Sequence, residues 1–400
     1  MPASQQKSNP ALAGTEGFAL YVHWPFCLSK CPYCDFNSHV REGIAFGRWE
    51  RALSHALGQA ANQTPGRRLT SIFFGGGTPS LMPPASVARL IGEAKVLWET
   101  DPGLEVTLEA NPTSAEGARF RQYREAGVNR LSLGIQALRA EALRFLGRTH
   151  GVGEAVAALE AAKAVFPRVS FDLIYGLPGQ TVAAWREELA EALALADGHL
   201  SLYQLTIEPG THFFQLYREG KLAPLADDAA AALYETTQAA MEEAGFPAYE
   251  ISNHARRGEA CRHNLTYWKA GEYVGIGPGA HGRIGGREAM EARLATAAIR
   301  QPERWLAAAE DGGAAWETVE PLDSESRLAE LAMMGLRLRE GLAHERFRRQ
   351  TGRDIAAAFP AERLTALQDG GFLVLDGEGL RATPKGRLRL NAVLGRLLTG

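Results

Sequence analysis

Short apolar segments rich in β-branched and aromatic residues alternate along the first half of the chain with longer segments of helical periodicity. The apolar segments, which predict strands, are residues 19–23, 69–74, 104–109, 130–135, 169–174 and 200–207. The helical patterns between them cover residues 46–61, 84–98, 115–126, 152–165 and 183–195. Strands that alternate with helices form parallel sheets with right-handed crossovers, so the pattern predicts six parallel strands. If this sheet bends into a partial barrel, its active site will lie at the carboxyl ends of the strands.

Beyond residue 321 the pattern changes to short helices that precede a hairpin. Helical stretches are predicted over residues 327–339, 343–351, 361–369 and 384–398. Two short apolar runs flank the turn sequence Asp-Gly-Glu-Gly at residues 376–379, which predicts a β-hairpin. This order indicates a small winged-helix-like domain that caps the barrel. Residues 295–319 are rich in alanine, and we expect a helical connection there. The predicted domains are therefore a flexible tail (1–17), a barrel (18–290) and a C-terminal domain (291–400).

Composition and charge narrow the class of protein. The chain has 400 residues, of which 46% are hydrophobic and 22% charged, values that are ordinary for globular proteins. Its net charge of −3 offers no bulk attraction to nucleic acid. A winged helix could bind DNA, but the arginines of this region interleave with acids and leucines, as on a solvated helix face. These are Arg337, Arg339, Arg346, Arg348 and Arg349. We therefore expect no nucleic-acid partner. No apolar run approaches about 18 residues, so no transmembrane segment is predicted.

The strongest chemical signal is a loop after the first predicted strand that holds Cys27, Cys31 and Cys34. Three thiolates at this spacing can bind three corners of a cubic iron–sulfur cluster and leave the fourth iron open. An open coordination position makes a metal site reactive. Structural zinc is one alternative, but it needs four ligands and no second cysteine pair follows. Three buried thiols are the other, which the Pro and Lys residues of the loop disfavour. An oxygen-sensitive site and four cysteines indicate a reducing, cytoplasmic location.

Polar residues at the predicted strand ends are further candidates. Three glycines at 75–77 follow the second strand, where they allow close approach to a ligand or form a tight turn. Glu109 ends the third strand, where it could bind a ligand or be a solvated loop carboxylate. Asp172 lies within an apolar strand, and a buried carboxylate needs a partner. Arg148 is a candidate partner.

The cysteine motif and its flanks, Tyr-Val-His-Trp-Pro-Phe at residues 21–26 and Asp-Phe at 35–36, resemble the radical S-adenosylmethionine (SAM) family. They are most similar to the branch of the oxygen-independent coproporphyrinogen III oxidases and the HemW-type haem chaperones. The resemblance covers residues 18–287 and resumes more weakly after residue 321. It implies a partial (β/α)6 radical-SAM barrel with a [4Fe-4S] cluster held by the three cysteines. SAM would chelate the open iron, and reductive cleavage of SAM is possible in principle.

The same resemblance assigns site residues by position. Tyr21, Gly76 and Glu109 would contact the cluster-bound SAM. A second SAM position would be lined by Tyr33, Gly77, Thr78, Gln136, Arg148 and Asp172. Retention of both sets does not by itself establish that two molecules bind.

Two features separate the members of this branch. Phe36 stands where the oxidase carries an additional cysteine. The sequence Arg-His-Asn-Leu-Thr-Tyr-Trp at residues 262–268 resembles a motif of the HemW group. That resemblance makes His263, Asn264, Tyr267 and Trp268 candidate haem contacts, although a histidine among aromatic residues is more often a core residue. His23, His254 and His281 are alternative ligands, and Cys261 is expected to be a buried, inert thiol.

The resemblance therefore implies a cluster- and SAM-binding haem chaperone, with haem as its cargo and an acceptor protein as its partner. A coproporphyrinogen III oxidase is the first alternative. The second is a radical SAM enzyme that acts on another small molecule, with the histidine motif purely structural.

Overall fold

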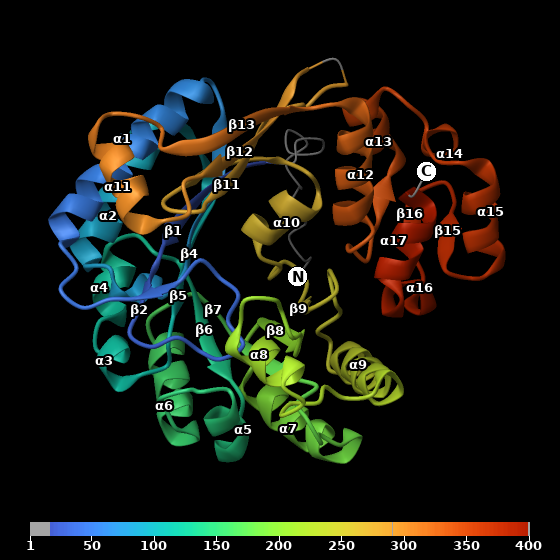
Figure 1. Cartoon of the computed structure of the whole chain (residues 1–400), viewed down its shortest axis with the longest axis horizontal. Coiled ribbons are helices and arrows are strands. Elements are labelled where there is room, and N and C mark those ends of the chain that lie inside the picture. The colour runs from blue at the N-terminus through green and yellow to red at the C-terminus, as the bar shows by residue number, and fades with distance from the viewer. Residues whose placement is uncertain (1–16, 290, 399–400) are drawn as a thin grey trace, which may run out of the picture.

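The computed structural model describes residues 17–289 and 291–398. Nearly all of the predicted N-terminal tail therefore lies outside the described residues. A single mixed sheet of eleven strands forms the centre of the protein, and helices pack on its outer face (Figure 1). All six predicted strands are present as parallel neighbours in chain order. They are β1 (Phe18–Trp24), β4 (Arg68–Gly76), β5 (Glu99–Ala110), β6 (Arg130–Gln136), β7 (Arg168–Tyr175) and β8 (His199–Gln204). The predicted partial barrel is confirmed.

The crossover helices also follow the sequence pattern. Those predicted as single helices are α1 (Phe46–Gln63), α2 (Pro84–Leu97), α6 (Val152–Lys163) and α7 (Val182–Leu195). The pattern over 115–126 instead forms two short helices, α3 (Ser114–Gly117) and α4 (Phe120–Glu125). Three more helices complete this half: α5 (Ala140–Phe145), α8 (His212–Arg218) and α9 (Asp227–Glu243). Each long helix buries one apolar stripe against the sheet, as an amphipathic helix must.

The sheet extends further than the sequence pattern indicates. The additional strands are β9 (Asn253–Ala255), β10 (Glu272–Ile276), β11 (His281–Gly285), β12 (Arg293–Ala298) and β13 (Trp316–Leu322). Strand β10 pairs in parallel with β1, on the side opposite to β4, and β11 to β13 continue the sheet antiparallel. At Gly275 in β10, an added Cβ would lie 2.3 Å from the carbonyl oxygen of His281. Only glycine permits this close approach.

The predicted helical connection over residues 295–319 is wrong. This segment instead contains most of β12, the helix α11 (Pro302–Glu310) and the start of β13. Alanine favours helices only weakly, and pairing between neighbouring strands overrides that preference here. The hydrogen-bonded sheet therefore runs to Leu322, past the boundary predicted at residue 290. We propose that the C-terminal domain begins near Leu322.

Helix α11 is fixed to the barrel by aromatic packing. The rings of Trp305 and Trp49 stack with centroids 5.7 Å apart and an interplanar angle of 6°. Trp49 in turn packs edge-on against Phe26 at 5.0 Å, immediately before the first cysteine of the cluster loop. This cluster joins the added strands to the segment that carries the cysteines.

The C-terminal domain has its own apolar core, built by residues such as Leu336, Phe347 and Leu380. Its helices are α12 (Ser324–Gly335), α13 (His344–Thr351), α14 (Ile355–Ala358), α15 (Ala361–Asp369), α16 (Pro384–Leu388) and α17 (Leu390–Leu398). The predicted hairpin is confirmed as β15 (Leu373–Leu375) and β16 (Gly379–Ala382), and β14 (Leu342–Ala343) adds a third strand. The helix predicted over 384–398 is broken at Arg389, whose φ of −121° and ψ of 30° are not helical.

Ion pairs and backbone contacts attach this domain to the sheet. Arg283 in β11 pairs with Glu330 in α12 at 3.0 Å, and Arg327 donates to the carbonyl of Gly286 at 2.8 Å. Across residues 17–289 and 291–398, no helix has the length and apolar character needed to cross a bilayer.

We expect Trp305→Ala to lower the free energy of unfolding by about 3–5 kcal/mol, because a fully buried indole is lost and a cavity remains. Val96→Ala is the matched control, since this side chain is 86% exposed and its truncation is expected to change stability by less than about 0.5 kcal/mol. Denaturant titration of both variants measures the difference. Equal stability of the two variants would show that the Trp49–Trp305 stack does not hold α11.

Candidate cluster and cofactor site

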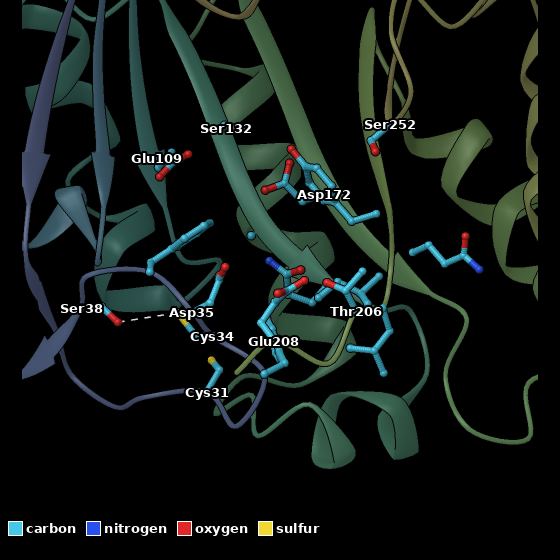
Figure 2. A pocket seen from close by; sticks show the side chains of 18 of the residues that line it. Cys31, Cys34, Asp35, Ser38, Glu109, Ser132, Asp172, Thr206, Glu208 and Ser252 are labelled. Atoms are coloured by element: carbon cyan, nitrogen blue, oxygen red, sulfur yellow. Dashed lines mark hydrogen bonds between the residues drawn. The ribbon is translucent and has the colours of Figure 1, made fainter. Parts of the chain in front are cut away.

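A cavity of about 820 Å³ opens at the carboxyl ends of the parallel strands. Its walls come from the cysteine loop, from the ends of β4 to β8 and from residues 387–392 of the C-terminal domain. Figure 2 shows Cys31 and Cys34 at one side, with Glu109 and Asp172 on the strands above them. The cavity lies at the end of the barrel that the strand pattern predicts.

The cysteine loop leaves the barrel after β1 and is held at both ends. Strand β2 (Phe26–Cys27) pairs in parallel with β3 (His39–Val40), which closes the loop at its base. Within it, the backbone N–H of Cys34 donates to the carbonyl of Cys31 at 3.1 Å. Cys27, Cys31 and Cys34 are free thiols, half-buried, and all three line the cavity.

Each of the three sulfurs has its own polar neighbour. The hydroxyl of Thr78 donates to Cys27 Sγ at 3.4 Å, and the Arg148 guanidinium donates to Cys31 Sγ at 3.2 Å. Ser38 Oγ lies 3.6 Å from Cys34 Sγ. Burial raises the pKa of the Cys27 thiol, while the Thr78 hydroxyl favours the thiolate. Hydrogen bonds to sulfur ligands of this kind tune the reduction potential of an iron–sulfur cluster.

The three cysteines of the loop are candidate ligands of a metal cluster. Among the residues of known placement, no three His, Cys, Asp or Glu side chains converge closely enough to hold one ion. A cubic cluster instead binds each sulfur at a separate iron, and the three separate thiols fit that need. We propose that these cysteines hold a [4Fe-4S] cluster, which would supply the electron for reductive SAM chemistry.

Asn111 is a site residue that the sequence reasoning missed. It accepts from Arg148 Nη2 at 2.6 Å and donates through Nδ2 to Thr78 Oγ1 at 3.2 Å. A continuous network of hydrogen bonds therefore links Cys31, Arg148, Asn111, Thr78 and Cys27. This network crosses from the end of β5 to the end of β4. The available signal was position: Asn111 follows a strand end directly after Glu109 and Ala110.

The predicted pairing of Arg148 with Asp172 needs correction. Arg148 donates to Cys31, to Asn111 and to the Gly134 carbonyl, the last at 2.9 Å. Asp172 instead receives hydrogen bonds from the hydroxyls of Ser201 and Ser132 on the neighbouring strands. Arg148 acts on Asp172 only as a nearby positive charge. Its Nη1 and Nη2 atoms bind the cluster loop and the strand ends, while the buried Nε has no hydrogen-bond partner among the described residues.

Two carboxyl groups form the acidic floor of the cavity. Burial, and then the charge of Asp172, raise the pKa of Glu109 to about 8. Burial also raises the pKa of Asp172, to about 6, against the favourable hydroxyls of Ser201 and Ser132. Two buried carboxyls that disfavour each other's charge are suited to a cationic ligand. SAM carries both an ammonium and a sulfonium group.

Backbone conformation brings the neighbouring SAM candidates to the cavity. An added Cβ at Gly76 (φ 112°) would lie 2.6 Å from the His23 ring, and one at Gly77 would lie 2.7 Å from the Phe26 carbonyl oxygen. The glycines therefore let the end of β4 approach the cysteine loop closely. Gln136, at a register shift of β6, has the strained φ of 73°. Tyr33, Gly76, Gly77, Thr78, Glu109, Gln136, Arg148 and Asp172 all line the cavity.

Tyr21 and the four haem candidates do not line this cavity. His263, in α10 (Arg262–Trp268), is only 2% exposed, and burial lowers its pKa to about 3. Its Nδ1 lies 3.2 Å from Ser71 Oγ and its Nε2 lies 2.8 Å from the Tyr267 hydroxyl. Both ring nitrogens are therefore occupied. Asn264 donates to the Tyr249 hydroxyl at 3.3 Å. In this conformation the segment forms a buried polar–aromatic cluster that packs against side chains of β1 and β4.

The alternative ligands are also outside the cavity. His23 and His254 are buried, and His281 is exposed on β11. Cys261 is fully buried, and burial raises its pKa to about 12, so it is an inert thiol as predicted. Of the described residues that line the cavity, none is a histidine.

Comparison with known proteins identifies the family of this chain. A profile described as the Radical SAM superfamily matches residues 21–193, and one described as the HemN C-terminal domain matches residues 322–389. The chain is 36% identical over 389 residues to Heme chaperone HemW of Haemophilus influenzae, covering 95% of this chain and 98% of that protein. It is 40% identical over 395 residues to the mitochondrial Radical S-adenosyl methionine domain-containing protein 1 of Bos taurus, covering 96% and 88%.

Among solved structures, coproporphyrinogen III oxidase (HemN) from Escherichia coli matches with a TM-score of 0.79 and 22% sequence identity. The match covers 97% of this chain and 92% of that one, and it shows a shared fold. The chain belongs to the radical SAM superfamily, whose cofactors are a [4Fe-4S] cluster and SAM, and within it to the family of the HemW proteins and their mitochondrial relatives.

We expect Cys27→Ala, Cys31→Ala and Cys34→Ala each to abolish the iron–sulfur absorption of anaerobically reconstituted protein, because each removes one of three cluster ligands. Cys261→Ala is the matched control: it removes the fourth cysteine, which is buried away from the cavity, and should leave the spectrum unchanged. Full absorption in any of the three loop variants would disprove this ligand set.

SAM affinity is expected to rise with pH until about pH 8. The folded-state pKa of Glu109 lies above its ordinary value, so the ligand-free carboxyl is protonated at pH 7 and must lose its proton to bind a cation. Affinity should therefore increase up to about tenfold per pH unit below pH 8 and level off above it. Titration calorimetry in buffers of different ionisation enthalpy measures both the affinity and the released proton.

Two variants test the assignment of this pH dependence. Glu109→Gln should bind SAM weakly with no such slope. Asp172→Asn should move the inflection to lower pH, because it removes the negative charge that raises the pKa of Glu109. An unchanged slope in Glu109→Gln would assign the proton to another group.

Proposed function

We propose that this protein binds haem as cargo and delivers it to an acceptor protein, with the cluster and SAM bound in the same barrel. The observation that carries this proposal is the near full-length similarity to proteins named Heme chaperone HemW, from several bacteria. That similarity includes both the cluster-binding barrel and the C-terminal domain. The acceptor is proposed only as a class, a haem-requiring protein.

The size and lining of the cavity support this function. Its volume of about 820 Å³ lies in the upper part of the usual range for small-molecule sites, about 300–1,000 Å³. Leu28 and Phe36 stand at its wall with 72% and 61% of their surfaces exposed. Exposed apolar side chains at a cavity wall are suited to bind flat apolar ligands, which would remove these side chains from contact with water.

We assign the SAM residues to this cavity as a proposal. Gly76 and Glu109 would contact the cluster-bound molecule, and Tyr33, Gly77, Thr78, Gln136, Arg148 and Asp172 would line a second position. Tyr21 does not line the cavity, so it would support the SAM site indirectly. Its hydroxyl lies 3.0 Å from His23 Nδ1.

The segment from His263 to Trp268 is proposed to support the cavity rather than to coordinate iron. A ligand role for His263 would require the loss of its contacts with both Ser71 and Tyr267. We further propose a reducing compartment, which the exposed cluster loop requires. The predicted cytoplasm is one such compartment, and the mitochondrial relatives indicate another.

Coproporphyrinogen III oxidation is the second candidate function, favoured by the shared fold with the Escherichia coli oxidase. Against it stands Phe36, at the position where the resemblance places an additional cysteine in the oxidase. The two functions predict different products from the same mixture.

We expect the cluster-reconstituted protein, incubated anaerobically with coproporphyrinogen III, SAM and reductant, to yield no decarboxylated tetrapyrrole. SAM cleavage in the same tube shows that the cluster is competent, and chromatography resolves the tetrapyrroles. The same protein loaded with haem should transfer it to apomyoglobin. We expect this transfer to be faster than transfer from haem-loaded serum albumin. Decarboxylated product would establish the oxidase, and a protein that neither binds nor transfers haem would refute the chaperone function.

A further inference from the structure

We propose that three arginines of the C-terminal domain, Arg337, Arg387 and Arg389, form an anion-binding wall that receives the propionate groups of the tetrapyrrole. All three line the cavity whose acidic floor is formed by Glu109 and Asp172. This inference rests on the proposed function and adds to it the part of the site that would select a carboxylate-bearing cargo.

No described acid makes a direct contact with these arginines, although Glu250 acts on Arg337, and Glu242 on Arg387, as a nearby negative charge. None of the three forms an ion pair with a carboxylate in the described part of the chain. Arg387 donates to the neutral Gln238 amide at 3.1 Å, and Arg337 donates to the Met333 carbonyl at 2.6 Å. Several other half-buried arginines here do have acidic partners, such as Arg168 with Glu105 at 2.6 Å. A guanidinium at a cavity wall without an acid is suited to a ligand carboxylate, which it can bind through two parallel hydrogen bonds.

The local fold directs these side chains into the cavity. Helix α16 ends at Leu388 and α17 begins at Leu390, so the break at Arg389 turns residues 387–392 toward the cavity wall. The first backbone N–H groups of α17 have no intrahelical acceptor, and the positive end of its dipole lies at the same place. Both features favour a bound carboxylate beside Arg387 and Arg389.

Arg337 is positioned by the motif that the sequence analysis singled out. Its guanidinium carbon lies 5.8 Å from the centre of the Trp268 ring, in a cation–π contact. Burial lowers the pKa of Arg337, and Glu250 opposes this only as a nearby charge. Trp268 does not line the cavity, so it acts through Arg337 as a positioning residue.

Charge separation across the cavity would orient an amphipathic cargo. The floor is acidic, the C-terminal wall is basic, and the apolar side chains of Leu28, Phe36 and Leu388 lie along the walls. A flat ring with carboxylates along one edge would turn that edge toward the arginines. At neutral pH the carboxylate of Asp172, whose pKa is about 6, would repel the opposite orientation.

The test compares haem with its dimethyl ester, in which the same ring carries no anionic carboxylate. Each compound is titrated by absorption into the full-length protein and into Arg387→Gln, Arg389→Gln and Arg337→Gln. Haem affinity should fall about tenfold or more for each lost arginine, the size of one charge-assisted hydrogen bond. The ester should bind the parent protein more weakly than haem and show no further loss in the variants.

Control variants separate this effect from damage to the fold. Arg396→Gln removes an exposed arginine of α17 that does not line the cavity, and it should keep parental haem affinity. Arg387→Lys should recover part of the loss, because it restores charge without the two-pronged geometry. Trp268→Leu should weaken haem binding in the parent and have little further effect in Arg337→Gln. All variants should retain the cluster spectrum and parental SAM affinity.

The possible failures are distinguishable. Equal affinity of the parent for haem and for the ester, or haem affinity unchanged in all three glutamine variants, would overturn the arginine wall and leave haem binding intact. A loss of SAM affinity in place of haem affinity would assign the arginines to the SAM carboxylate and also overturn it. A parent protein that binds neither compound would refute the proposed function, and the wall with it.

Discussion

The Arg148 guanidinium holds the cluster loop to the barrel, and the rest of the site depends on it. It donates to the Cys31 sulfur, to the Asn111 amide and to the Gly134 carbonyl, and so ties the loop to the ends of β5 and β6. Through Asn111 and Thr78 the same network reaches Cys27. Three strand ends are thereby fixed relative to two sulfurs. A loop that holds an oxygen-sensitive cluster needs such support, because loops are otherwise the most mobile part of a barrel.

Electrostatics divides the cavity into two regions. The floor carries Glu109 and Asp172, whose raised pKa values show that negative charge there is costly until a cation arrives. The C-terminal wall carries arginines that form no ion pair with a carboxylate of the described residues. Each region is complementary in charge to one ligand. The carboxyls of the floor suit the cationic groups of SAM, and the arginines of the wall suit carboxylates. The fold places both in one cavity because residues 387–392 of the C-terminal domain line it together with the strand ends.

Periodicity was sufficient to predict the six barrel strands and the C-terminal hairpin, because both are local patterns of apolar residues. The strands β10 to β13 could not be predicted in this way. β11 contains two glycines, β12 contains three alanines and β13 contains a proline, so none has a typical strand pattern, and these segments become strands by pairing with β1 and with each other. The cysteines and the strand-end candidates were found because their spacing is itself a signal. Asn111, His263 and Arg387 were missed or misplaced because their roles depend on burial and on distant neighbours.

The order in which the walls of the cavity occur along the sequence has a consequence for biosynthesis. The cysteines, the acidic floor and the strand ends all precede residue 210, whereas Arg387 and Arg389 lie among the last fifteen residues. Translation from the N-terminus therefore completes the cluster-binding part long before the arginines leave the ribosome, and domains generally fold in that order. A nascent chain could acquire its cluster early, but the proposed arginine wall would be incomplete until residues 387–389 have been made. Chains that stop before these residues would thus lack this part of the proposed haem site.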